Sequence, residues 1–198
     1  MSKVLVIDTS SKNMYVMVLD GEKTTKKTLV DNQKQHSVLI NGVIDEVLQS
    51  AKVTLNDIDV FAVGIGVGSF TGIRVGVSVA KGFNLACRKK YIQVNSLQTL
   101  AYTKKELTNC IYDAGKGYYF AVYDGIKEVV APTLIDDQRA KELSESENAV
   151  CFDADADYGE AIEAQVRDKL ANGDFSADLV PLYVRRCQAE EELDKCRK

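Results

Sequence analysis

The turn Gly66-Val67-Gly68-Ser69-Phe70-Thr71-Gly72 decides the fold, because it lies between two segments with different hydrophobic patterns. Residues 60–65 before it form a continuous apolar run, which predicts a central parallel strand buried on both faces. Residues 71–87 after it are expected to form a helix. A buried strand that leads through a glycine-rich turn into a helix is typical of an α/β protein.

The first half of the chain is expected to form one lobe around this unit. The Asp20-Gly21 pair predicts the tip of a β-hairpin, and residues 35–50 have apolar positions at helical spacings. The segment 24–30 is more polar, so we expect it near an edge of the sheet. The expected elements are strands over 4–8, 15–19, 24–30, 60–65 and 91–94 and helices over 35–50, 71–87 and 96–102, the last capped by Ser96.

The second half repeats the order of the first. Its expected elements are strands over 110–113, 118–123, 127–131 and 149–152 and helices over 136–143 and 158–170. Segments 18–23 and 122–127 both read apolar, apolar, Asp, Gly, any residue, Lys, although Asp-Gly hairpins are common enough for a coincidence. We interpret the repeat as a duplication, with an N-terminal lobe over 1–104 and a smaller C-terminal lobe with a charged tail over 105–198.

The composition limits the function. The chain has 198 residues, of which 45% are hydrophobic, and a net charge of −4. It can bury a core, but it offers no basic footprint for unaided nucleic-acid binding, so a role on RNA needs a partner that holds the RNA. The opening residues are too short for a signal peptide, and no apolar run reaches the about 20 residues of a membrane span. We expect a cytoplasmic protein without membrane contact.

Metal and disulfide chemistry are not expected. The five cysteines are widely spaced and contain no Cys-x-x-Cys pair, which is typical of free thiols in a reducing compartment. His36 is the only histidine, so a histidine-rich metal site is impossible. We expect no metal site.

The glycine-rich turn has the geometry of an anion site but not the spacing of a phosphate motif. Thr71 stands where the dinucleotide pattern needs a third glycine or alanine, and Gly72 is followed by Ile73 instead of lysine. We therefore favour a tight turn capped by Ser69 or Thr71 over a phosphate cradle. The weak candidates for contacting a nucleotide are Asp8, Ser10, Gly68 and Ser69, and no cofactor is expected.

No catalytic residue is expected. Gly76-Val77-Ser78-Val79-Ala80 nearly matches a nucleophile elbow, but it lies inside the expected helix, and the lone histidine precedes it. The same helix has a different use, because Gly72, Gly76 and Ala80 recur every four residues and share one face. Such a face permits a close backbone approach, either by the protein's own sheet or by a second subunit.

The turn and the following residues, Gly66-Val67-Gly68-Ser69-Phe70-Thr71-Gly72-Ile73-Arg74-Val75-Gly76, resemble the signature of the bacterial TsaB (YeaZ) family. Ile7-Asp8-Thr9-Ser10, His36-Ser37 and Pro181-Leu182-Tyr183-Val184-Arg185 are also similar to that family. Two departures stand out. Val67 replaces a proline of the family signature, and the segment 113–119 lacks the family's arginine and glutamate.

The resemblance implies an actin-like ATPase or sugar-kinase-like fold of two related lobes, each a mixed sheet flanked by helices. It implies a non-catalytic subunit that supports threonylcarbamoyladenosine formation on tRNAs that read codons beginning with A. The implied partners are a TsaD-like paralogue, which catalyses the transfer, and a TsaE-like ATPase, with tRNA bound only through the complex and a homodimer when the chain is alone.

The resemblance also places the partner interface on the helices over 35–50 and 71–87. The implied interface residues are His36, Leu39, Val43, Gly72, Ile73, Gly76, Ala80 and Phe83. Two other hypotheses stay open. One is a free-standing nucleotide-binding enzyme of the kinase-like superfamily, supported by Asp8 and the glycine-rich turn, and the other is an unusual peptidase.

Overall fold

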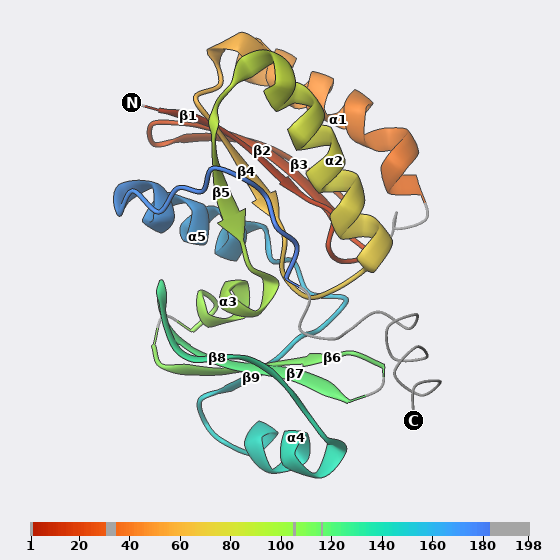
Figure 1. Cartoon of the computed structure of the whole chain (residues 1–198), viewed down its shortest axis with the longest axis vertical. Coiled ribbons are helices and arrows are strands. Elements are labelled where there is room, and N and C mark those ends of the chain that lie inside the picture. Colours follow the sequence, from red (N-terminus) through yellow and green to blue (C-terminus); the bar gives the residue numbers. More distant parts are fainter. Residues whose placement is uncertain (1, 31–34, 105, 116, 183–198) are drawn as a thin grey trace, which may run out of the picture.

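The computed structural model describes residues 2–30, 35–104, 106–115 and 117–182, which form two mixed β-sheets with helices around them (Figure 1). The strands are β1 (Lys3–Asp8), β2 (Met14–Asp20), β3 (Lys23–Leu29), β4 (Val60–Gly64), β5 (Lys90–Val94), β6 (Thr108–Asp113), β7 (Tyr118–Asp124), β8 (Lys127–Ile135) and β9 (Ala149–Cys151). The helices are α1 (His36–Ala51), the 3-10 helix η2 (Leu55–Asp57), α2 (Phe70–Cys87), α3 (Ser96–Ala101), α4 (Asp137–Ser144) and α5 (Gly159–Ala171).

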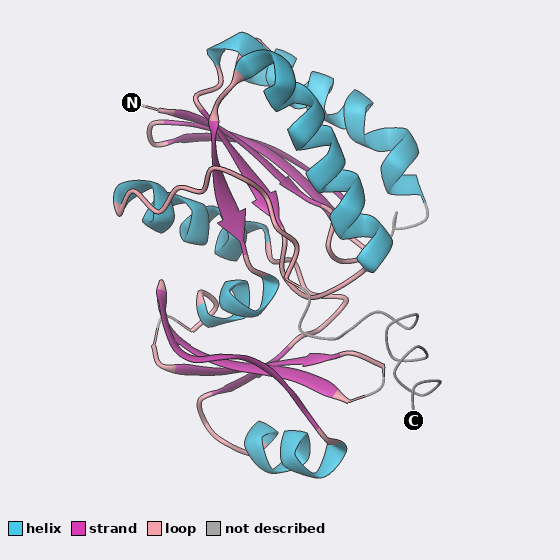
Figure 2. Cartoon of the chain, viewed as in Figure 1, coloured by secondary structure: helices cyan, strands magenta, loops and turns pink. Residues whose placement is uncertain are grey.

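The first sheet has the order β3-β2-β1-β4-β5 and is covered on both faces. The strands β1, β4 and β5 pair in parallel, and their side chains are buried almost throughout, which explains the continuous apolar runs in the sequence. The helices α1 and α2 cover one face, and α5 covers the other (Figure 2). The polar strand β3 lies at the edge, as predicted.

The second sheet repeats the topology of the first. Its order is β8-β7-β6-β9, which matches β3-β2-β1-β4 strand for strand. In both sheets the first strand forms an antiparallel hairpin with the second and pairs in parallel with the fourth. Gly21 and Gly125 at the two hairpin tips both have a positive φ, near 57°. The α/β fold of two related lobes is therefore confirmed.

The chain returns to the first lobe after completing the second sheet. Helix α5 packs on the first sheet, and the hydroxyl of Tyr15 in β2 accepts a 3.1 Å hydrogen bond from the backbone of Tyr158. The following segment pairs with the free edge of β5 through Tyr91 and Ser176. Residues 159–182 thus pack on the first sheet, although they lie beyond the boundary expected at residue 104.

Smaller differences concern one cap and the tail. Asn95, not Ser96, caps α3, because its side-chain oxygen accepts a 3.0 Å hydrogen bond from the Leu97 amide. The charged tail, Cys187, Cys196 and the end of the C-terminal family motif lie outside the described residues. Within them, Cys87, Cys110 and Cys151 are free thiols, and no cluster of three or more potential metal ligands occurs. No helix in the described part of the chain is long and apolar enough to cross a membrane.

Candidate functional site

The four weak nucleotide candidates meet where β1 ends. The Ser10 amide donates to Oδ1 of Asp8 at 2.7 Å, and the Ser69 amide donates to the Ser10 carbonyl at the same distance. Gly68 has φ of 145°, and a Cβ there would lie 2.2 Å from the Ser10 carbonyl oxygen, so a side chain does not fit. The glycine-rich turn is therefore packed against the β1–β2 loop of its own chain.

Backbone amides at the N-terminus of α2 have hydrogen-bond partners within the protein. Oγ of Ser69 accepts a 3.1 Å hydrogen bond from the Gly72 amide, so Ser69 is the cap that the sequence predicts. The Ser69 amide is itself engaged with Ser10. Two of the amides that an anion would need at this helix start thus already have partners in the protein.

Asp8 is the titratable group at the centre of this site. Its side chain is 3% exposed and lies beside Gly64, where a Cβ would come within 2.6 Å of the carboxyl carbon. Burial raises the pKa of Asp8, and hydrogen bonds from Ser10 oppose the rise. The charged carboxylate is therefore held in an unfavourable environment at neutral pH.

We expect Asp8→Asn to raise the free energy of unfolding at pH 7. The folded protein binds more protons than the unfolded chain between the ordinary pKa of aspartate and the raised pKa of Asp8, so wild-type stability falls as pH rises through that window. The advantage of the variant should shrink as pH is lowered toward 3.8. Urea denaturation of both proteins across this range measures it, with the exposed Asp45→Asn as control. A variant less stable than wild type at pH 7 would show that the carboxylate stabilises the fold.

Aromatic side chains fill the space between Asp8 and the second lobe. Phe152 stacks between Tyr112 and Tyr158, with ring centroids 4.3 and 5.3 Å away. The remaining cavity, which Asp8, Tyr15 and Tyr158 help to line, has a volume of about 20 Å³. This is room for about one water molecule. The carboxyl ends of parallel strands are where α/β proteins bind ligands, and here they leave only this small space.

The aromatic filling was missed by the sequence analysis. Phe152 and Tyr158 lie about 140 residues from Tyr15 in the sequence. They come near Tyr15 only because the chain returns to the first lobe after the second sheet. Nothing in the local pattern around these residues distinguishes them from ordinary core positions.

The small-residue face of α2 lies on the protein's own sheet. A Cβ on Gly76 would lie 2.7 Å from Oγ1 of Thr9, and one on Gly72 would lie 2.1 Å from the Thr9 carbonyl oxygen. Ala80 is fully buried. Of the two readings of this face, the structure supports packing against β1. Gly72, Gly76 and Ala80 are therefore not accessible to a partner in this structure.

The other implied interface residues also point inward. His36, Val43 and Ile73 are at most 6% exposed, and Leu39 and Phe83 are half-buried against the same core. The ring nitrogens of His36 have no hydrogen-bond partner in the described part of the chain. Burial lowers the pKa of His36, and the nearby backbone of Lys12 and Thr9 opposes the shift. Six of the eight residues are thus buried and two are half-buried, and the partner interface implied for them stays a prediction.

The outer face of α1 and α2 carries an open groove of about 450 Å³. It is lined by Ser37, Ile40, Phe70, Thr71, Arg74, Val75, Ser78 and Val79. The guanidinium of Arg74 lies 3.7 Å above the centre of the Phe70 ring, which is 48% exposed. Val38 on α1 and Leu85 on α2 are 77% and 85% exposed. We call the groove lined by those eight residues the helix groove; Val38 and Leu85 are not part of its lining.

Comparisons with known proteins agree on one group. Residues 29–176 match the family model described as TsaD, tRNA N6-adenosine threonylcarbamoyltransferase. The TsaB of Haemophilus influenzae, a tRNA threonylcarbamoyladenosine biosynthesis protein, is 37% identical over 105 residues, which cover 52% of this chain and 44% of that protein. TsaB of Bacillus subtilis is 29% identical over 136 residues, covering 65% of this chain and 59% of the relative.

The solved structure of YeaZ from Pseudomonas aeruginosa superposes with a TM-score of 0.78 at 21% identity. The superposition covers 92% of this chain and all of the other. At 21% identity, this superposition shows that the two proteins share a fold. The matches to the curated relatives span about half of their length.

Proposed function

Because the chain belongs to the TsaD family of tRNA N6-adenosine threonylcarbamoyltransferases, and within it to the TsaB (YeaZ) group, we propose that it is the non-catalytic partner subunit of a TsaD-like transferase. In this role it supports threonylcarbamoyladenosine formation in the cytoplasm, on tRNAs that read codons beginning with A. A TsaE-like ATPase completes the complex, and the chain forms a homodimer when it is alone.

The closed space beside Asp8 is the observation that carries the proposal. A cavity of about 20 Å³ does not admit a nucleotide, since ligand pockets have volumes of about 300 to 1,000 Å³. The stacked rings of Tyr112, Phe152 and Tyr158 would have to separate to open it. The small volume supports a subunit that acts through the protein that it binds.

The helix groove is the surface that we assign to the TsaD-like paralogue. It combines an exposed aromatic ring, a cation stacked on that ring and the half-buried Val75 and Val79. Aromatic and arginine side chains are enriched where proteins bind one another. The core stripe of the two helices supports this outer face, because Gly76 packs against β1 and Ala80 is fully buried.

Co-purification with the TsaD-like protein of the same cell, followed by a tRNA modification assay, tests the proposal. We expect a stable complex, and we expect transfer by the TsaD-like protein to depend on this chain. A transferase that works at full rate alone would contradict the proposal. ATP hydrolysis by the isolated chain would favour a nucleotide-binding enzyme instead.

Ser78→Arg tests the place of docking. Ser78 is exposed in the groove, and arginine is a good helix former, so the fold should persist while the bulky charge blocks the partner. We expect affinity for the TsaD-like protein to fall at least about tenfold, equivalent to about 1.4 kcal/mol. Calorimetric titration measures the affinity. Gln49→Arg, exposed on α1 outside the groove, is the control and should bind normally. Equal affinity of the two variants would place docking elsewhere.

A further inference from the structure

Three consecutive cations, Arg88, Lys89 and Lys90, join α2 to β5 in a turn that the structure fixes rigidly. The backbone of Arg88 has a left-handed conformation, with φ of 53°. The Arg88 amide donates a hydrogen bond to the Asn84 carbonyl at 2.9 Å. The Asn84 side chain then accepts from the Lys89 amide and donates to the Lys89 carbonyl at 2.9 Å. We call these three residues the cationic turn. Its backbone is held in place independently of the charged side chains.

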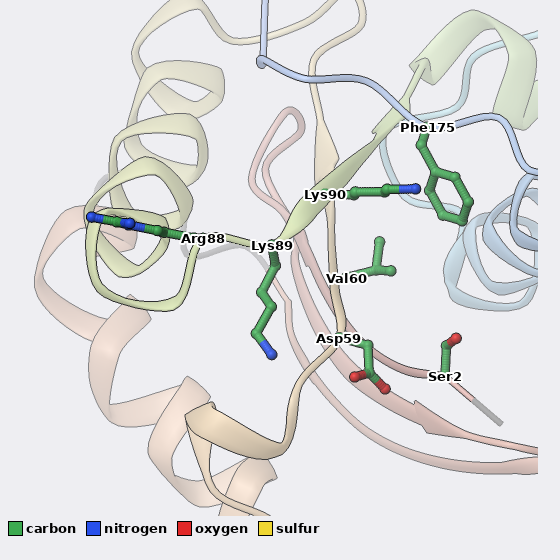
Figure 3. A pocket seen from close by; sticks show the side chains of 7 residues that line it. All are labelled: Ser2, Asp59, Val60, Arg88, Lys89, Lys90 and Phe175. Atoms are coloured by element: carbon green, nitrogen blue, oxygen red, sulfur yellow. The ribbon is translucent and has the colours of Figure 1, made fainter.

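An open pocket of about 620 Å³ lies against the cationic turn (Figure 3). Phe175 forms one wall, and Nζ of Lys90 lies 4.8 Å above the centre of its ring. The three cationic side chains diverge in Figure 3, with Lys90 extending toward Phe175 and Arg88 in the opposite direction. Diverging charges do not enclose one small anion. They suit an extended polyanion that carries a charge at each repeat.

The positive charge of the turn is only partly offset by nearby carboxylates, since three cations face Asp57 and Asp59. Within the described residues, Arg88 and Lys89 make no side-chain hydrogen bond or ion pair. The two nearby acids keep their negative charge, because Asp57 and Asp59 accept hydrogen bonds from neutral backbone amides, those of Thr54 and Lys3. Those Thr54 hydrogen bonds lower the pKa of Asp57, with a smaller contribution from Lys89. A local excess of positive charge thus persists on a protein whose net charge is −4.

The cationic turn and the helix groove lie at opposite ends of α2. The groove lining ends at Val79, nine positions before Arg88 in the turn, which corresponds to about 14 Å along a helix. A protein seated in the groove therefore leaves the turn outside its central contact. The two surfaces can be occupied together, one by a protein and the other by a second ligand.

We propose that the cationic turn contacts the phosphate backbone of the tRNA while the complex holds that tRNA. The inference rests on the proposed function, since the net negative charge gives this chain no means to bind RNA alone. The turn adds affinity without reading sequence, because phosphate contacts position a nucleic acid and base contacts specify it. It lies on the partner subunit, so it extends the RNA surface of the complex beyond the transferase.

The test uses the complex with the TsaD-like protein and an unmodified tRNA that reads a codon beginning with A. The double variant Arg88→Glu and Lys89→Glu reverses two charges and leaves Lys90 over Phe175. The control, Lys127→Glu and Lys141→Glu, makes the same change in net charge on exposed positions of the second lobe. Fluorescence anisotropy measures tRNA binding between about 50 and 200 mM salt, the range in which phosphate contacts lose affinity. Size-exclusion chromatography first measures assembly of each complex.

We expect both variants to assemble and only the first to bind tRNA more weakly. Its Kd should rise about 3- to 10-fold at low salt, and the slope of log K against log salt should become shallower by about 1 to 2. Unchanged affinity and slope in an intact complex would overturn the inference while leaving the proposed function standing. Weakened protein assembly, with normal tRNA affinity of the complex that forms, would also overturn it and would identify the turn as a protein contact. Failure of the wild-type chain to assemble at all would overturn the proposed function together with this inference.

Discussion

Gly72→Ala is expected to destabilise the protein by about 3 kcal/mol or more, because the new methyl group would clash with the backbone of Thr9. Its Cβ would lie 2.1 Å from the Thr9 carbonyl oxygen, which is a backbone atom directly after β1. The two segments are also tied, since Oγ1 of Thr9 donates to the Gly72 carbonyl at 2.7 Å. To make room, α2 would have to move off the sheet. Urea denaturation measures the loss, and a loss of soluble protein has the same meaning.

Gly82→Ala in the same helix is the matched control. A Cβ there meets nothing within 4 Å, so only the helix propensity changes and stability should rise by about 0.5 to 1 kcal/mol. The propensity gain is similar at both positions, so the difference between the variants isolates the contact with Thr9. A Gly72→Ala protein as stable as Gly82→Ala would refute the packing of α2 on β1 described above.

Leu179→Ala should have the second large effect on stability, a loss of about 2 to 5 kcal/mol. Leu179 is 1% exposed and belongs to the core between the first sheet and α1 and α2. It anchors the segment that pairs Ser176 with Tyr91 at the edge of β5. The ion pair between Lys81 and Asp178, at 2.7 Å, is partly exposed and cannot replace that anchor.

The neighbouring Val180→Ala is the control for Leu179→Ala. Val180 is 59% exposed, so its truncation should change stability by no more than about 0.5 kcal/mol. Urea denaturation of both variants makes the comparison. Equal stabilities would mean that the C-terminal segment is not part of the first-lobe core.

Most of the fold could be predicted because its signals are local. The buried runs of β1 and β4, the Asp-Gly tips of the two hairpins and the repeat of element order depend on neighbouring residues only. The prediction for the N-cap of α3 was wrong by one residue. Asn95 and Ser96 are both good N-cap residues, and the sequence alone does not distinguish between them. The place of α5 could not be predicted, because its packing on β2 is set by contacts over more than 140 residues.

The candidate site was less accessible to sequence reasoning. The approach of Asp8, Ser10, Gly68 and Ser69 follows from the parallel pairing of β1 with β4, which the apolar runs indicate. The faces of α2 were harder to assign. Small residues fit equally well against a strand or against another subunit, and only the distance from Gly76 to Thr9 distinguishes these uses.

The return of α5 and its trailing segment to the first sheet constrains how the protein is made. A ribosome releases the five strands of the first sheet early. Helix α5, which covers one face of that sheet, and Leu179, which packs in the core on the other face, are synthesised after the second sheet. From the end of β5 to Leu182 the ribosome adds 88 residues, which takes about 4 to 18 seconds at about 5 to 20 residues per second. During that interval the nascent sheet exposes Tyr15, Met17 and Val94, which are buried in the finished protein. The newborn chain therefore exposes apolar surface of the kind that chaperones bind until residues 159–182 have been synthesised.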